Sequence, residues 1–289
     1  MRPFTYQRAE DAASAVRATS RMAATQFLAG GTTLLDLMKL DVMRPEHVVD
    51  INGLEQQFGQ IEATPRALQL GALVRMSEAA EDPAILRDYP VIAQSLRFAA
   101  SPQLRNMATL GGNVLQRTRC PYFRVTSYRS CNKRDPGSGC AAMEGVARKH
   151  AVLGVSEHCI ATYPGDFAQA LLALGAAVGI LGPGGQRHIP FEQLHRPPGN
   201  SPHLETSLAP GEMITAFSVP AAAWTRRSVY LKVRDRESYE FALASAAVAL
   251  DLDGRGRAAS PDWTWRGGDD PLARSRGRAD PAGRAPHRR

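Results

Sequence analysis

The stretch R-N-M-A-T-L-G-G-N (Arg105 to Asn113) organises this sequence, because it places a turn of small residues between two more apolar runs. Gly111 and Gly112 lack a Cβ, so another group can approach the backbone closely there. Successive backbone N–H groups in such a turn suit an anion such as a phosphate. The stretch therefore predicts a site for a phosphate-bearing group.

A similar turn lies earlier, in Q-F-L-A-G-G-T-T-L-L-D-L-M-K-L (Gln26 to Leu40). The pattern predicts an apolar strand, a Gly-Gly-Thr-Thr turn and a helix. The first N–H groups of a helix are unpaired and its dipole is positive there, so this geometry also favours an anion. By itself such a turn is more often purely structural. It is not a G-x-G-x-x-G motif, so a nicotinamide-binding Rossmann domain is not indicated.

All four cysteines follow within one segment, at Cys120, Cys131, Cys140 and Cys159. Their spacing, C-x10-C-x8-C-x18-C, contains no C-x-x-C pair. It is compatible with a metal cluster, a zinc site, two disulfides or free thiols. The segment is also basic, with Arg117, Arg119, Arg124, Arg129, Lys133 and Arg134. Its two histidines, His150 and His158, are expected on the surface. A phosphate site beside a metal site is what an electron-transfer protein needs.

The other periodicities predict an α+β fold of short strands and helices. The expected elements are a strand and helix over residues 4–18, a strand at 45–51, a hairpin at 59–74, a helix from Met76 capped by Ser77, a helix at 89–100, a helix from Asp166, a hairpin at 176–190, a strand at 211–220, and a strand and apolar segment over 228–252. Phe98, Trp224 and Tyr239 are expected in the core.

Length and charge exclude several classes of protein. A chain of 289 residues suggests two or three domains. No apolar run is long enough to cross a bilayer, and the N-terminus has no apolar signal region, so we expect a cytoplasmic chain that could still be exported attached to a partner. Residues 255–289 contain nine arginines and four aspartates, which supply most of the net charge of +7. The remainder is nearly neutral, so nucleic-acid binding is not indicated.

Four motifs together resemble the FAD-binding medium subunit of molybdenum hydroxylases, the xanthine dehydrogenase and aldehyde oxidoreductase family. They are L-A-G-G-T-T (Leu28 to Thr33), T-L-G-G-N (Thr109 to Asn113), P-G-D (Pro164 to Asp166) and Y-L-K-V-R (Tyr230 to Arg234). The resemblance covers about residues 1–254. It implies the PCMH-type fold shared with vanillyl-alcohol-oxidase-like flavoproteins, with two subdomains that clasp FAD and an incomplete C-terminal α+β domain.

The resemblance also implies the residues that contact FAD. They are Gln26, Phe27, Leu28, Ala29, Gly30, Gly31, Thr32, Thr33, Leu34, Thr109, Gly111, Gly112, Asn113, Asp166, Ile214 and Lys232. Without it, Asp166 would be interpreted as a helix cap and Lys232 as a solvated side chain. No side chain is expected to act as acid, base or nucleophile, because the flavin does the chemistry.

The segment from about 114 to 163 is an insertion relative to most of the family. It resembles the insertion of the subtype similar to periplasmic aldehyde oxidoreductases, which adds a [4Fe–4S] cluster. The resemblance therefore implies that Cys120, Cys131, Cys140 and Cys159 hold such a cluster.

The implied function is electron transfer. A molybdopterin-binding large subunit would oxidise an aldehyde or a purine-type heterocycle, and a small subunit with two [2Fe–2S] clusters would pass the electrons to the FAD of this chain. The FAD would then pass them to an external acceptor. No nucleic acid or membrane is an expected partner. The alternative is a self-standing PCMH-type flavin oxidase or reductase.

We expect four segments: FAD-binding subdomain 1 at 1–55, subdomain 2 at 56–222, the start of a C-terminal flavoprotein domain at 223–256, and an aberrant tail at 257–289. The tail is rich in Arg, Gly, Pro and Asp. Plausible codons for residues 262–273, read one nucleotide later, spell a segment similar to the family's G-G-V-A-x-x-P-W-R. We therefore interpret the tail as the product of a frameshift near residues 257–261.

Overall fold

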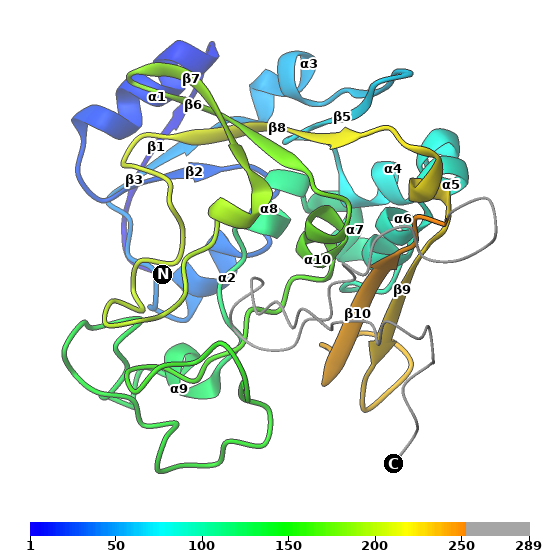
Figure 1. Cartoon of the computed structure of the whole chain (residues 1–289). Helices are drawn as coiled ribbons and strands as arrows, with labels where there is room; N and C mark the ends of the chain where they lie inside the picture. Colours follow the sequence, from blue (N-terminus) through cyan, green and yellow to red (C-terminus); the bar gives the residue numbers. More distant parts are fainter. Residues whose placement is uncertain (253–289) are drawn as a thin grey trace, which may run out of the picture.

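The computed structural model describes residues 1–252 of the chain, and its strands form three separate sheets (Figure 1). The sheets come from residues 5–50, 61–220 and 228–249. Mixed strands and helices confirm the α+β class. The subdomain boundaries stay a prediction, and the proposed frameshift lies outside the described residues.

The first sheet is parallel, with β3 (His47–Asp50) between β1 (Thr5–Arg8) and β2 (Thr25–Leu28). Parallel neighbours need crossover connections, and α1 (Ala12–Arg21) links β1 to β2 as the sequence predicts. Asp11 caps α1 by accepting a hydrogen bond from the N–H of Ser14. The Gly-Gly-Thr-Thr turn follows β2 and leads into α2 (Leu34–Lys39).

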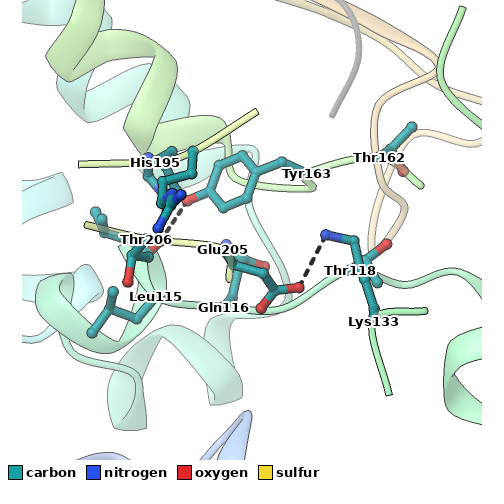
Figure 2. Close-up of a pocket in the computed structure, with 11 residues that line it drawn as sticks. Leu115, Gln116, Thr118, Lys133, Thr162, Tyr163, His195, Glu205 and Thr206 are labelled. Atoms are coloured by element: carbon teal, nitrogen blue, oxygen red, sulfur yellow. Dashed lines mark hydrogen bonds and ion pairs between the residues drawn. The ribbon is translucent and has the colours of Figure 1, made fainter. Parts of the chain in front are cut away.

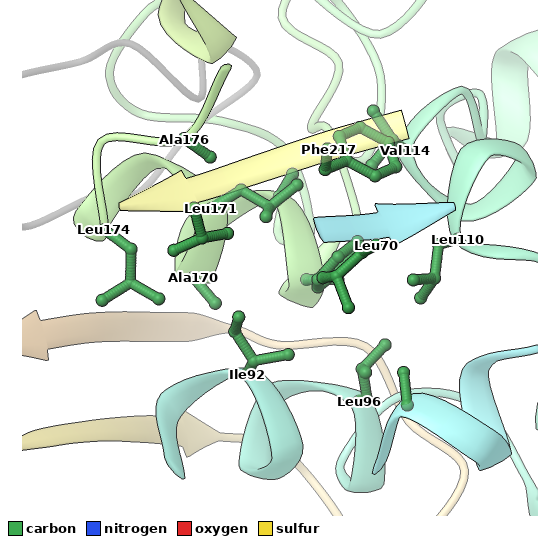
Figure 3. Packing of buried hydrophobic residues seen from close by; sticks show 14 of the residues in the cluster. Leu70, Ile92, Leu96, Leu110, Val114, Ala170, Leu171, Leu174, Ala176 and Phe217 are labelled. Carbon is green, nitrogen blue, oxygen red and sulfur yellow. The ribbon is translucent and has the colours of Figure 1, made fainter. Parts of the chain in front are cut away.

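The second sheet is antiparallel, and a cluster of buried side chains lies between it and several helices. Its order is β4 (Ile61–Ala63), β5 (Ala67–Gly71), β8 (Met213–Pro220), β6 (Ala177–Gly182) and β7 (Gly185–Pro190). Figure 3 shows Ile92 and Leu96 of α6 (Pro90–Arg97) facing Leu70 of β5 and Leu171 of α10 (Asp166–Ala173). The remaining helices are η1 (Asn52–Leu54), α3 (Glu55–Phe58), α4 (Met76–Glu81), α5 (Pro83–Asp88), α7 (Pro102–Met107), α8 (Leu110–Val114), α9 (Pro121–Arg124), η2 (Phe191–Gln193) and η3 (Ala223–Arg226).

The third sheet is a two-stranded ribbon of β9 (Ser228–Val233) and β10 (Ala244–Ala249), whose strands contact α6 and α10. The inner face of β9 carries Ser228, Tyr230 and Lys232, and Tyr230 is 1% exposed. Val229, Leu231 and Val233 alternate with the inner residues and are exposed. A two-stranded ribbon is marginal alone, so its inner contacts with the helices hold it in place.

Several local expectations are wrong. Ser77 lies inside α4, and the residue that precedes this helix is Arg75. Phe98 and Tyr239 are exposed, and each contacts an arginine instead of the core. Trp224 is partly buried against the main core, as expected. Within residues 1–252 no helix is long and apolar enough to span a membrane.

Candidate functional site

The two glycine turns pack directly against each other. A Cβ on Gly30 would overlap the backbone carbonyl of Met107, at the end of α7. On Gly111 it would lie 3.1 Å from the carbonyl oxygen of Ala72. Packing within the protein therefore requires glycine at position 30 and leaves little room for a side chain at position 111.

The backbone N–H groups of the second turn already have partners. Those of Leu110 and Gly111 donate to the carbonyls of Val74 and Ala72, at 2.9 and 2.8 Å. Those of Gly112 and Asn113 donate to the hydroxyl and the carbonyl of Thr109. The expectation that this turn binds an anion through its N–H groups is therefore wrong.

The first turn differs, because its N–H groups are available. Among the hydrogen bonds of residues 1–252, none is donated by the N–H of Gly31, Thr32 or Thr33. Gly31 has a φ of +72°, which favours glycine, and these residues are half-buried. Unpaired donors at a turn before a helix are suited to a phosphate.

The second turn instead offers an open surface and an unsatisfied acceptor. Gly112 is exposed, and a Cβ there would meet only the hydroxyl of Thr109, at 3.0 Å. The side-chain Oδ1 of Asn113 is buried and has no hydrogen-bond partner in the described part of the chain. Buried polar atoms are nearly always paired, so this atom fits a ligand that donates to it.

Most of the remaining predicted residues of the site lie on β2, at the start of α2 and on β8. Gln26, Phe27 and Leu28 lie on β2, and Leu34 begins α2. Ile214 is buried on β8 beside Thr215, whose carbonyl accepts from Ala72, the neighbour of Gly111. The structure thus brings the two turns and Ile214 together.

Asp166 and Lys232 form a second centre, and both default interpretations of them are wrong. Their side chains are 5% and 2% exposed, with Lys232 Nζ 2.7 Å from Asp166 Oδ2. Asp166 is the first residue of α10, whose N-cap is Gly165, so its carboxylate is not a cap. Lys232 also donates to the carbonyl of Phe98. A buried charge needs such a partner.

Tyr230 completes this centre and was missed by sequence reasoning. Its hydroxyl donates to Asp166 Oδ1 at 2.6 Å. Burial raises the pKa of Asp166, and the charge of Lys232 and the hydrogen bonds from Lys232 and Tyr230 oppose that rise. Burial likewise raises the pKa of Tyr230, so its hydroxyl stays protonated as a donor. The available signal was the period of two that places Tyr230 on the same strand face as Lys232.

Replacing Lys232 with methionine is expected to lower the free energy of unfolding by about 3–5 kcal/mol, because Asp166 would keep a buried charge without its partner. Lys39→Met, on the exposed end of α2, is the matched control. Adding Asp166→Asn to the Lys232 variant should recover most of the loss. Denaturant unfolding measures all three, and equal stability of Lys232→Met and the parent would contradict this account.

The four cysteines converge in one apolar cluster, in which Leu37 of α2 also takes part. All four are free thiols, and all except Cys140 are buried. Cys120 Sγ lies 3.2 Å from His150 Nε2, while His150 Nδ1 is buried without a partner. Burial raises the pKa of the Cys120 thiol to about 11.

A thiol set of this kind fits a four-thiolate cluster in chemistry and number. Within residues 1–252, however, no three His, Cys, Asp or Glu side chains are grouped closely enough to hold a single metal ion. The expectation that His150 is a surface residue is wrong, because its imidazole contacts Cys120 inside the cluster.

Ion pairs attach the segment that carries the cysteines, residues 114–163 (the cysteine loop), to α2 and to the segment between β7 and β8. Asp36 of α2 pairs with Arg119 and Arg124. Glu205, in the segment after η2, pairs with Arg117 at 2.7 Å and with Lys133 at 3.2 Å. Figure 2 shows Lys133 reaching toward Glu205 in the pocket beside Tyr163 and His195.

Glu205 makes the attachment dependent on pH. Burial alone raises the pKa of its carboxyl, but Arg117 and Lys133 outweigh burial and lower that pKa below 4.5. A lowered folded-state pKa stabilises the fold above the unfolded-state pKa, and the contribution is lost as pH falls through the folded-state value. We expect Glu205→Gln to cost about 2 kcal/mol of unfolding free energy at neutral pH.

This cost should shrink as the pH falls below 4.5, because the parent's carboxylate then becomes protonated. Glu62→Gln, on the exposed part of β4, is the control. Thermal unfolding of the three proteins across this range measures the effect. A cost that stays constant with pH would contradict the role of Glu205.

A cavity of about 800 Å³ connects the buried carboxylate to the cysteine loop. It is lined by Asp166 and Gln169 of α10, by Cys120 and His150, and by the connection into β10. Its volume lies in the range of small-molecule and cofactor sites. The cavity therefore joins the second centre to the cysteine cluster.

Known proteins resemble this chain in sequence and in fold. The family described as "FAD binding domain in molybdopterin dehydrogenase" matches residues 2–222. The aldehyde oxidoreductase FAD-binding subunit PaoB of Escherichia coli K12 is 50% identical over 245 residues, which span 84% of this chain and 76% of that protein. The xanthine dehydrogenase FAD-binding subunit XdhB of the same organism, a putative one, is 26% identical over 75% of this chain and 57% of its own.

Solved structures agree on the fold. CO dehydrogenase from Oligotropha carboxidovorans superimposes with a TM-score of 0.66 at 24% identity, over 90% of this chain and 74% of that chain. Quinoline 2-oxidoreductase from Pseudomonas putida 86 gives 0.64 at 21% identity, over 90% and 72%. By the extent of the family match and the identity to its relatives, the chain belongs to the FAD-binding medium subunits of the molybdenum hydroxylases.

Proposed function

We propose that the chain binds FAD between its two glycine turns and serves as the electron-transfer subunit of a molybdenum hydroxylase. The observation that supports this most is the first turn, where the N–H groups of Gly31, Thr32 and Thr33 donate to no partner among residues 1–252. In a protein of this family, those donors fit the diphosphate of the dinucleotide. When bound, FAD supplies the chemistry of accepting electrons and releasing them to an acceptor.

The other residues are assigned by what each offers a flavin nucleotide. Residues 26–34 form the strand and turn under the diphosphate, while Thr109 holds the second turn in shape through Gly112. Asn113 Oδ1 would accept a hydrogen bond from the cofactor. Asp166 and Lys232, paired with each other and buried, would contribute fixed charges to the binding of the cofactor. Each role is binding or orientation, so no side chain transfers a proton.

The partners follow from the family to which the chain belongs. A molybdopterin-binding large subunit would oxidise the substrate, and a small subunit with two [2Fe–2S] clusters would pass electrons to this chain. An external acceptor would then receive them. The 50% identity to an aldehyde oxidoreductase subunit favours an aldehyde over a heterocycle as the substrate class. Export with a signal-bearing partner is part of the same proposal.

We also propose that Cys120, Cys131, Cys140 and Cys159 hold one [4Fe–4S] cluster. Their convergence in one cluster supports this, and Arg119 and Arg124 of the same loop would offset an anionic, thiolate-ligated centre. The raised pKa of Cys120 implies that metal binding would displace its proton. No electron-transfer role for this cluster is needed by the proposal.

Purifying the chain together with the subunits encoded beside its gene tests the proposed function. The expected result is a complex of three different chains whose visible spectrum contains flavin and iron–sulfur absorbance. A chain that purifies alone with FAD and oxidises a substrate without partners would favour the self-standing flavin oxidase or reductase. A chain without flavin in either preparation would overturn the proposal.

A further inference from the structure

We propose that Asp36 is a positioning residue for FAD, through which the cysteine loop holds the first glycine turn in its binding shape. The proposal rests on the proposed function, because it concerns the same dinucleotide site. Asp36 lies on α2, which begins directly after the Gly-Gly-Thr-Thr turn. The hydrogen bonds of its carboxylate go to Arg119 and Arg124 and not to the turn, so it would act through the helix.

The contacts of Asp36 are unusual for a half-exposed carboxylate. Arg124 Nη2 donates to both of its oxygens, at 3.1 and 2.9 Å, and Arg119 Nη1 donates to Oδ2 at 3.2 Å. Both arginines come from the cysteine loop and are only 28% and 22% exposed. Charge-assisted bonds of this geometry fix the orientation of two elements better than a single exposed ion pair does.

Apolar contacts reinforce the same attachment. Leu37, the next residue of α2, is 1% exposed and packs in the cluster that contains the cysteines. Val42 and Met43, just beyond the helix, pack against that cluster too. The face of α2 that points away from the first sheet is therefore covered by the cysteine loop.

A second attachment fixes the loop to the part of the chain that contains the antiparallel sheet. Glu205 pairs with Arg117 and Lys133, and it lies in the segment between β7 and β8 of that sheet. The cysteine loop is thus attached to α2, which follows the first turn, and to the segment between β7 and β8 (Figure 1). That segment belongs to the same part of the chain as the second turn. Since FAD must contact both turns, a loop that fixes their separation should strengthen FAD binding.

The test is the dissociation constant of FAD, measured by titrating flavin-free, full-length chain and following flavin fluorescence. Asp36→Asn is expected to weaken FAD about tenfold. Arg119→Gln/Arg124→Gln should weaken it by a similar factor. The three substitutions combined should do no more than either alone, because they remove the same attachment. Asp36→Glu, which keeps the charge, should recover most of the affinity.

Asp41→Asn is the matched control. Asp41 lies just after α2, and its carboxylate pairs with the exposed Arg2 and Arg44 instead of the arginines of the cysteine loop. It should leave the FAD affinity unchanged. Thermal unfolding of each flavin-free variant separates a local effect on binding from loss of the fold. If Asp36→Asn does not fold, the variant Arg119→Gln/Arg124→Gln takes its place in the comparison. An unchanged affinity in Asp36→Asn, or additive losses in the combined variant, would overturn the inference. Failure of the parent to bind FAD would instead overturn the proposed function.

Discussion

Gly112→Val is expected to reduce FAD binding by roughly a hundredfold or more while leaving the chain folded. Gly112 is exposed, and a Cβ there meets only the hydroxyl of Thr109. A valine side chain would therefore extend from the exposed surface of the second turn rather than into the protein. Flavin content per chain, together with the FAD dissociation constant, measures the effect.

Two further glycine variants make the result specific. Gly184→Val, in the β6–β7 turn, has no atom near its Cβ and should keep full FAD. Gly30→Val should lose both FAD and thermal stability, because its Cβ would overlap the carbonyl of Met107. If Gly112→Val retains the parent's affinity, the open surface at the second turn is not where the dinucleotide binds.

Cys120→Ser is expected to remove most of the iron from the protein. Anaerobically prepared parent should contain about four irons per chain, as one four-thiolate cluster implies. Replacing one buried ligand should lower this to below about one, since the cluster would lose a thiolate. Iron analysis measures the loss, and at saturating FAD most of the flavin should remain bound.

Ser127→Ala is the control, because Ser127 is exposed in the same loop. It should keep the parent's iron. One tightly bound zinc and no iron in the parent would contradict the cluster and support a structural zinc site. Intact disulfides in freshly isolated protein would contradict both metal sites.

The parts of the fold that follow from local patterns could be predicted from the sequence. Three features have a short-range cause: the cap at Asp11 before α1, the hairpin of β6 and β7, and the strand–turn–helix at Gly30 and Gly31. The α+β class could therefore be predicted. Ser77 was misplaced as a cap because helix starts depend on the preceding chain. Here Arg75 is fixed by a bridge to Thr109, far along the sequence.

The parts that depend on distant contacts could not be predicted from pattern alone. The period of two in β9 favours burying Val229, Leu231 and Val233, yet the structure buries Tyr230 and Lys232 against Asp166. A buried ion pair overrides hydrophobic alternation only once its partner is known. Likewise, nothing in the spacing of the turns shows that Gly30 faces the Met107 carbonyl rather than a ligand.

We expect this chain to accept electrons from partner subunits on a bound flavin. The most direct test adds an aldehyde anaerobically to the assembled complex and to the purified chain alone, and follows flavin absorbance in both. We expect the flavin of the complex to bleach and that of the isolated chain to stay oxidised. Bleaching in the isolated chain, or none in a complex whose large subunit is active toward the aldehyde, would contradict the account.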